Sequence, residues 1–494
     1  MGISLNPSTI LSGQGIDVSS LVQQIITEQS GELTVWQGQQ STFATQDGLL
    51  EGMENNLVSL QTAAEALASP TGALTAQAAT SSQTGVLTAT ADTTAISANH
   101  QITVNNLATT GTLYTDPIAA GADTSFLANG QTSGDIQLQV GGTSGTVHDI
   151  AITQGSNDTI SSLATYINNQ SNANGWGVTA SVVSDVTGSR LALFSQSSGS
   201  TGALAVAGNS NTTLTFDTPV GGTNASVTID GVPFSSTSNV VTGAIQGVTL
   251  NLLGQSTSGD PVQLTVGPDT NQISTAVNNF VSAYNTVVST INTQYVVDPT
   301  GATPAPPLEA DISLRAVQSN MLNDASYTVS VPGWPNTSGD ASETVNLASM
   351  GINMNTDGTL TVGSNAAGQT FGEFLAANPA AVQSFFQNAS GTGFANYFNS
   401  DLTNLTDPTS GPLNVDLAQN QAEDSDLTTT IANFETQLTT QTTALTAQYD
   451  SVNASLQAYP LLLQEITETL GTLGSGTSSS GSLVSSEPTL TSGL

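Results

Sequence analysis

Heptad periodicity at both ends of the chain constrains the fold most. Starting at Ile431, every seventh position is apolar, giving Ile431, Leu438, Leu445, Val452, Tyr459, Ile466 and Leu473. Between Asp17 and Leu67 the same spacing set on Val22 gives Val22, Gln29, Trp36, Phe43, Leu50, Leu57 and Ala64. A stripe of period 3.5 is the seam of a supercoiled helix pair.

These stripes predict one long helix from Asp17 to about Leu67 and a second from about Leu417 to Leu473, bent at Pro460. Asp17 is the expected N-cap of the first helix, and the turn-forming cluster from Ser69 to Gly72 should end it. Residues 1–16 carry turn formers without periodicity and should be flexible. We expect the two long helices to pair as a coiled-coil shaft closed by both chain ends. The alternative is two separate core helices of a globule. The residues expected at an interface with other subunits of an assembly are Val22, Ile25, Trp36, Phe43, Leu50, Met53, Leu57, Ile431, Phe434, Leu438, Leu445, Val452, Tyr459 and Ile466.

Several residues weaken this predicted shaft. Glutamine occupies seam positions at Gln39, Gln46, Gln441 and Gln448. Four glycines lie off the seam of the first helix, at Gly31, Gly38, Gly48 and Gly52. A glycine inside a helix costs about 1 kcal/mol against alanine. We therefore hypothesise that the terminal helices stay adaptable until they pack against a partner.

The composition excludes several classes of function. The chain has 494 residues and a formal net charge of −35, and its only basic side chains are Arg190 and Arg315. Without a set of lysines or arginines, neither nucleic acid nor an anionic membrane is an expected partner. No cysteine is present, which removes disulfides and thiolate sites. The first residues have no basic and apolar pattern of a cleaved signal, and no apolar run is long enough to span a bilayer.

Between the two helical ends the periodicity changes to two, which is typical of strands. Ile136 to Val140 and Val147 to Ile152 should form a hairpin. A short helix from Thr159 to Asn168 should carry Ile160, Leu163, Ala164 and Ile167 on one face. The fold class predicted is therefore multidomain α+β, with β-rich head domains inserted into the helical shaft. The strands before residue 111 are too few for a core and should share a sheet with those after 213. The predicted domains are a terminal domain of 1–42 with 421–494, a helical leg domain of 43–71 with 273–420, a β-rich head domain of 72–111 with 213–272, a second α+β head domain of 112–212, and a disordered tail of 474–494.

A search for catalytic and metal-binding patterns finds none that outweighs a structural interpretation. His100 and His148 lie in strand-like alternation, where solvent-facing side chains are expected. Asn353 to Gly358 resembles the start of a calcium loop, but the residue at its twelfth position is Ser364, and a turn is favoured. Three tryptophans and scattered carboxylates do not form a glycosidase site. We expect no enzyme activity and no cofactor.

Ordered motifs along nearly the whole chain resemble one family. Gly15 to Ile25 looks like an amino-terminal signature, and Ala76 to Ala91 with Ile102 to Ala108 is similar to the first head strands. Phe280 to Asn285 (FVSAYN) and Leu308 to Arg315 match later elements, as do Asp230 to Val266 and Leu347 to Leu360. Residues 150–206 resemble a repeat of flagellins and hook-associated proteins. The family is that of flagellar hook-associated protein 2, the filament-capping protein; the chain departs from it in lacking lysine.

This resemblance implies a structural protein that caps the distal end of the bacterial flagellar filament and promotes insertion of exported flagellin. It implies a homo-oligomeric ring, commonly a pentamer, with flagellin, hook–filament junction proteins and a flagellar export chaperone as partners. It also implies an extracellular location at the filament tip, reached through the flagellar type III system without a cleaved signal.

Two other interpretations remain open from the residues alone. One is another flagellar axial protein, either a flagellin or a hook–filament junction protein, which would share terminal coiled coils and export. The other is a surface adhesin whose β heads bind glycans or host mucin.

Overall fold

The computed structural model describes residues 17–296, 298–335, 344–388 and 391–474. The segment 1–16, predicted to be flexible, and most of the predicted disordered tail lie outside the described residues. The chain divides into two compact units, each made of several stretches. Unit 1 comprises Met1–Val58, Thr290–Ser319 and Asn404–Leu494, and unit 2 comprises Ser59–Ser289 and Asn320–Thr403.

The amino-terminal helical stretch is two helices, α2 (Val18–Gln29) and α3 (Gly31–Ala68). Asp17 caps α2, as predicted, because its carboxylate accepts a hydrogen bond from the N–H of Ser20 at 3.1 Å. The prediction of one continuous helix is wrong at Ser30, whose N–H and hydroxyl both bond back to α2, to Ile26 and Thr27 at 2.8 Å. Serine followed by glycine is a weak helix-forming pair, so the helix breaks there.

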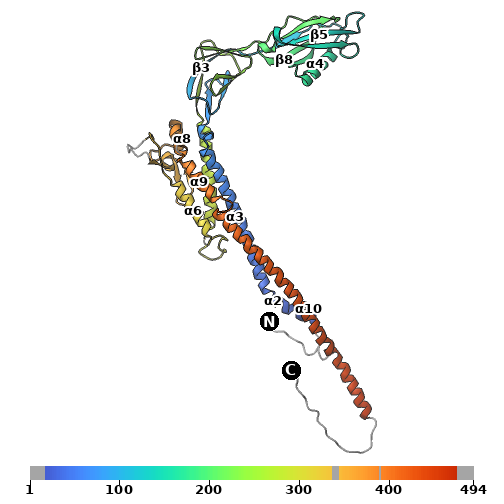
Figure 1. Ribbon diagram of the computed structural model, residues 1–494, viewed down its shortest axis with the longest axis vertical. Helices are drawn as coiled ribbons and strands as arrows, with labels where there is room; N and C mark the ends of the chain where they lie inside the picture. Colours follow the sequence, from blue (N-terminus) through green and yellow to red (C-terminus); the bar gives the residue numbers. More distant parts are fainter. Residues whose placement is uncertain (1–16, 297, 336–343, 389–390, 475–494) are drawn as a thin grey trace, which may run out of the picture. The chain divides into compact units, whose positions relative to one another are not determined.

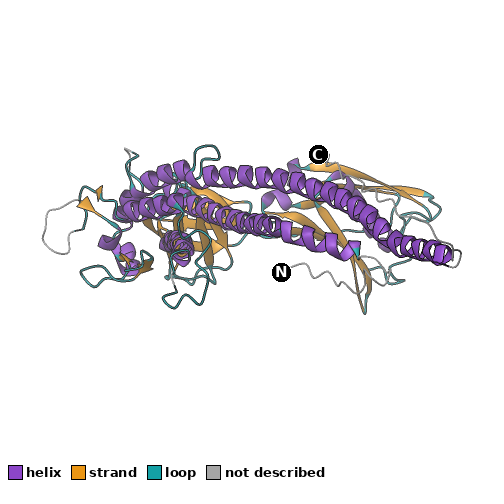
Figure 2. Cartoon of the chain, turned by 90° about the horizontal axis from the view of Figure 1, so that it is seen from below, coloured by secondary structure: helices purple, strands orange, loops and turns teal. Residues whose placement is uncertain are grey.

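The carboxy-terminal helix α10 (Pro412–Gly474) has 63 residues and begins before the predicted Leu417. It is continuous through Pro460, which has no N–H to donate to the carbonyl of Leu456. Figure 1 shows α10 beside α2 and α3, which are drawn in blue, and in Figure 2 two long helices again lie side by side.

The first β domain draws its strands from both sides of an insertion. Its five-stranded sheet has the order β1-β14-β3-β10-β11, and its three-stranded sheet the order β12-β13-β2. The strands are β1 (Gln77–Ser81), β2 (Leu87–Ala91), β3 (Ala98–Asn106), β10 (Ala225–Ile229), β11 (Val232–Ser236), β12 (Val240–Ile245), β13 (Val248–Leu252) and β14 (Val262–Pro268). The pairs β3–β10 and β2–β13 confirm that strands before 111 pair with strands after 213.

The inserted module contains two three-stranded sheets and one helix. The sheets have the orders β4-β8-β7 and β6-β5-β9. The elements are β4 (Thr110–Tyr114), β5 (Ser133–Val140), β6 (Thr146–Thr153), α4 (Ile160–Asn174), β7 (Val178–Asp185), β8 (Gly188–Ser198) and β9 (Leu204–Ser210). Its core includes Ile160, Leu163 and Ile167 of α4, the apolar helix face predicted from the sequence. This core is separate from the cluster inside the first β domain.

The remaining elements are mostly helical: α5 (Thr270–Thr293), α6 (Ile312–Ala325), α7 (Phe371–Ala377), α8 (Pro379–Phe386) and α9 (Phe394–Leu405). Five phenylalanines, each at most 1% exposed, build an aromatic core from these helices: Phe280, Phe385, Phe386, Phe394 and Phe398. Strands β17 (Ile352–Met354) and β18 (Leu360–Val362) form a hairpin, which confirms the turn favoured for Asn353 to Gly358. Short strands β15 (Val329–Ser330) and β16 (Thr344–Val345) pair as well.

Substitution of three glycines in α3 tests whether glycine lowers the stability of this helix. A methyl group added at Gly38, Gly48 or Gly52 would meet nothing within 4 Å. Each Gly→Ala substitution should therefore stabilise unit 1 by about 1 kcal/mol, through helix propensity alone. Urea unfolding followed by circular dichroism measures this, and a triple variant no more stable than the parent would contradict it.

Candidate functional site

The helices α3 and α10 run antiparallel in unit 1, as two direct contacts show. The Trp36 and Phe434 rings meet edge to face with centroids 5.2 Å apart. The side-chain amide of Gln40 donates to the hydroxyl of Thr428 at 2.7 Å. Residues nearer the amino terminus on α3 and α2 thus face residues nearer the carboxy terminus on α10. Helix α2 also contacts α10.

This pairing divides the predicted interface residues into three groups. Buried in the protomer are Val22, Leu50, Met53, Leu57, Ile431 and Leu438. Half-buried along the pair are Ile25, Trp36, Phe43, Phe434 and Leu445. Exposed are Val452 at 45%, Tyr459 at 66% and Ile466 at 47%. An interface role stays a prediction for all of them, and only the exposed group is free to meet a partner without rearrangement.

The glutamines of the seam are less buried than the heptad pattern predicts. A seam position predicts burial between the helices, which is wrong for Gln39 and Gln448 because both are exposed, whereas Gln441 is half-buried. Gln46 is half-buried, and its amide donates to the carbonyl of Pro307 at 2.9 Å. A groove of about 570 Å³ lies beside Gln46, lined by Phe43 and Leu427 together with Glu423 and Asp426.

The far end of α10 carries an apolar stripe with nothing packed on it in the described protomer. Every described side chain from 457 to 472 is exposed. Tyr459, Leu462, Ile466 and Leu470 recur at spacings of three and four, which places them on one side of the helix. Sequence reasoning missed Leu462 and Leu470, although the run Leu461-Leu462-Leu463 after Pro460 was a signal for an apolar surface. We define Tyr459, Leu462, Ile466 and Leu470 as the α10 stripe.

Carboxylates in this chain are satisfied mainly by backbone N–H groups and hydroxyls. Asp298 accepts the hydroxyl of Thr300 at 2.6 Å and N–H groups of Thr300, Ala302 and Thr303 at 2.8 to 3.1 Å. The Thr300 hydroxyl, with these N–H groups, holds the pKa of Asp298 well below its usual range. Asp357 accepts from Thr359 in the same way. In a chain without lysine, such turns satisfy the carboxylate groups with hydroxyl and backbone N–H donors.

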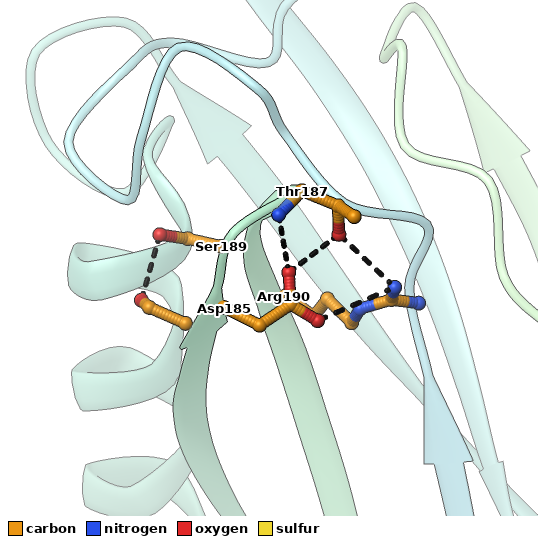
Figure 3. Close-up of polar contacts among 5 residues, drawn as sticks. Asp185, Thr187, Ser189 and Arg190 are labelled. Carbon is orange, nitrogen blue, oxygen red and sulfur yellow. Dashed lines mark hydrogen bonds and ion pairs between the residues drawn. The ribbon is translucent and has the colours of Figure 1, made fainter.

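One of the two arginines supports a hairpin tip in the inserted module (Figure 3). The Arg190 guanidinium lies 3.7 Å from the Asp185 carboxylate and donates to the hydroxyl of Thr187 at 3.4 Å. The Ser184 and Ser189 hydroxyls bond across the strands at 2.8 Å. These contacts fix the turn between β7 and β8, in which Val186 is fully exposed.

Both histidines have partners, which corrects the expectation that they simply face solvent. His100 Nδ1 lies 2.7 Å from the Asp230 carboxylate, and its side chain is 18% exposed. This pair lies at one wall of a groove of about 480 Å³ with Ile96, Val232 and Phe234. The His148 ring stacks on Trp176 at 4.7 Å, and burial lowers the pKa of His148. In the part of the chain that the structure describes, no group of three potential metal-ligating side chains occurs.

No described helix is long and apolar enough to cross a membrane. The arrangement that remains is a chain whose two ends pair as helices, with β domains inserted between them and an exposed apolar stripe. These are the features of a structural subunit that assembles with other proteins.

Comparison with known proteins places the chain within this class. The family model described as flagellar hook-associated protein 2 C-terminus matches residues 222–459, and that of its N-terminus matches residues 14–111. A third model, the flagellin hook IN motif, matches residues 135–197, which confirms the repeat seen in the sequence. The chain belongs to the flagellar hook-associated protein 2 family, the cap proteins of the flagellar filament.

Individual relatives agree with this assignment. The chain is 27% identical over 444 residues to the B-type flagellar hook-associated protein 2 of Pseudomonas aeruginosa, covering 84% of this chain and 88% of the relative. It is 25% identical over 344 residues to flagellar hook-associated protein 2 of Escherichia coli K12, covering 65% and 70%. The fold resembles the crystal structure of the D1-D2-D3 domains of the flagellar cap protein of Escherichia coli, with a TM-score of 0.54, 24% identity and coverage of 76% and 99%. The flagellin, junction-protein and adhesin alternatives are not favoured.

Proposed function

We propose that this cap protein docks on the end of the flagellar filament through the α10 stripe, and that its β domains form the cap itself. The observation that carries the proposal is the exposure of Tyr459 at 66%, Leu462 at 55%, Ile466 at 47% and Leu470 at 64%. Monomeric proteins rarely expose a contiguous apolar surface of this kind unless a partner covers it. An amphipathic helix with anchors at this spacing fits a groove between other helices.

The occupant we assign to the stripe is flagellin at the filament tip. The exposed side chains of Leu461 and Leu463, uncharged polar side chains and two glutamates surround the stripe, so its contacts are apolar and depend little on salt. The protein should act as a homo-oligomeric ring, which we expect to be a pentamer, seated next to hook–filament junction proteins before the filament grows. We assign it no catalytic role.

The predicted domain limits agree with a helical part that docks and β domains that form the cap. The separate cores of the two β domains support them as independent head domains, at 72–111 with 213–272 and at 112–212. We further propose export through the flagellar type III channel, with an export chaperone and no cleaved signal. The many weak helix positions in α3 suit a chain that must be unfolded for passage.

Truncation tests the assignment of docking to the chain ends. Deleting residues 1–40 or 430–494 should abolish binding to filament tips while the β domains stay folded. Motility and electron microscopy of tips in a strain lacking the native cap provide the readout, and near-ultraviolet circular dichroism reports on the folded head. Normal capping by either truncated chain would reject the assignment.

A further inference from the structure

A pair of acidic side chains meets between α6 and α9 inside unit 2. Asp324, in the last turn of α6, is 1% exposed. The Asp401 carboxyl group on α9 lies close enough to interact with it electrostatically. The Oδ2 atom of Asp324 is buried and has no hydrogen-bond partner among the described residues. Because two ionised carboxylates have no proton to donate, neither can satisfy the other at this buried position unless one is protonated.

Among the described residues, the other titratable groups that face this pair are tyrosines. Tyr397, one turn before Asp401 on α9, lies close enough for its hydroxyl to interact with Asp324. Its ring stacks on Tyr327, with centroids 3.9 Å apart and planes at 7°. From α5, Tyr284 faces the same site, and its hydroxyl donates to the carbonyl of Met321 at 3.4 Å. Tyrosines at neutral pH supply hydroxyl donors but no positive charge.

No cation is available to neutralise the two carboxyl groups. The chain has no lysine, and its two arginines are Arg190 and Arg315. Arg190 lies in the inserted module with Asp185. The Arg315 guanidinium stands 5.3 Å from the centre of the Tyr295 ring and donates to the carbonyl of Glu309 at 3.2 Å. His100 and His148 belong to the β domains.

An uncompensated buried charge is strongly destabilising, and protonation removes that charge. We propose that Asp324 holds this proton beside the Asp401 carboxyl group, and that this carboxyl pair is a proton-binding site that fastens α6 to α9. Loss of the proton leaves two like charges in contact and loosens the two helices.

The direction of the pH effect follows from proton linkage. Burial, and then the neighbouring Asp401 charge, raise the pKa of Asp324 from its ordinary 3.8 to about 7. The folded chain therefore binds more protons than the unfolded chain between these two values. The stabilisation is fully present below the unfolded value and is lost as the pH rises through about 7. Alkaline solution should thus loosen α6 and α9.

Asp324→Asn tests this, because asparagine is neutral at every pH and keeps a donor. For the full-length parent, the thermal unfolding midpoint should fall between about pH 5 and about pH 8. For Asp324→Asn it should change much less over that range and exceed the parent at the higher pH. Asp401→Asn should act in the same direction, which keeps the test valid if one variant folds poorly. Asp450→Asn, at an exposed position of α10, makes the same change in net charge and should follow the parent.

Two local measurements distinguish a proton bound at Asp324 from a general effect of charge. Hydrogen exchange of α6 and α9, corrected for intrinsic rates, should quicken at alkaline pH in the parent but not in Asp324→Asn. Infrared spectra should show a carboxylic-acid carbonyl band near neutral pH that Asp324→Asn removes. Parallel pH profiles for parent and Asp324→Asn would overturn the proposal. So would a rise in the parent's midpoint with calcium chloride that Asp324→Asn abolishes, because that result would assign the site to a metal cation.

Discussion

Phe394→Ala is expected to lower the free energy of unfolding of the helical part of unit 2 by about 3–5 kcal/mol. Phe394 is fully buried and lies at the centre of the aromatic core, with its ring 5.4 to 5.8 Å from those of Phe280, Phe385, Phe386 and Phe398. Alanine removes contacts to four rings at once, and the surrounding helices cannot all close on the cavity. Denaturant unfolding monitored by tyrosine and tryptophan fluorescence measures the loss.

Two controls show whether the loss comes from the cavity. Phe394→Leu keeps most of the apolar volume and should cost clearly less than alanine. Ile312→Ala alters a side chain that is 82% exposed at the start of α6 and should change stability by no more than about 0.5 kcal/mol. Equal losses for Phe394→Ala and Ile312→Ala would contradict the assigned core.

Replacing Leu462, Ile466 and Leu470 together by glutamine should abolish filament growth without unfolding the protein. All three side chains are exposed in the protomer, and glutamine is a good helix former, so unfolding of the isolated chain should hardly change. Docking, however, loses three apolar anchors, at about 1.5–3 kcal/mol each if they are fully buried in the complex. Cells carrying the variant should be non-motile and should release unpolymerised flagellin into the medium.

A matched surface variant controls for the loss of exposed apolar area. Val183, Val186 and Leu253 are also exposed but belong to the β domains. Their joint replacement by threonine should leave motility close to that of the parent. Motile cells with the glutamine variant, at normal levels of secreted protein, would contradict docking through the α10 stripe.

Sequence patterns predicted the helices and strands well where the structure depends only on residues that are close in the sequence. The Asp17 cap, the end of α3 before Ser69-Pro70, the β5–β6 hairpin and the turn at Asn353 to Gly358 all depend on residues close in sequence. The break at Ser30 was missed because the heptad pattern continues across it, from Ile25 towards Trp36. Backbone preference outweighed the apolar pattern at that point.

The candidate sites were harder to predict, because they depend on what lies beside a residue in space. An apolar column has the same appearance whether a partner helix covers it, as at Ile431, or not, as at Tyr459. The two cases differ because the pairing of α10 with α2 and α3 includes Ile431 and ends before Tyr459. Asp324 and Asp401 belong to different helices, and neither helix pattern signals that the carboxyl groups meet. The partner of His100, Asp230, likewise comes from a distant strand turn.

Photo-crosslinking within assembled flagella tests the central claim most directly. A photoreactive amino acid placed at Tyr459 or Ile466 in the full-length chain should form covalent adducts with flagellin when filament tips are illuminated. The same group at Val186 of the inserted module serves as the control and should form none with flagellin. Capped filaments that give no flagellin adduct from either α10 position would contradict docking through this helix.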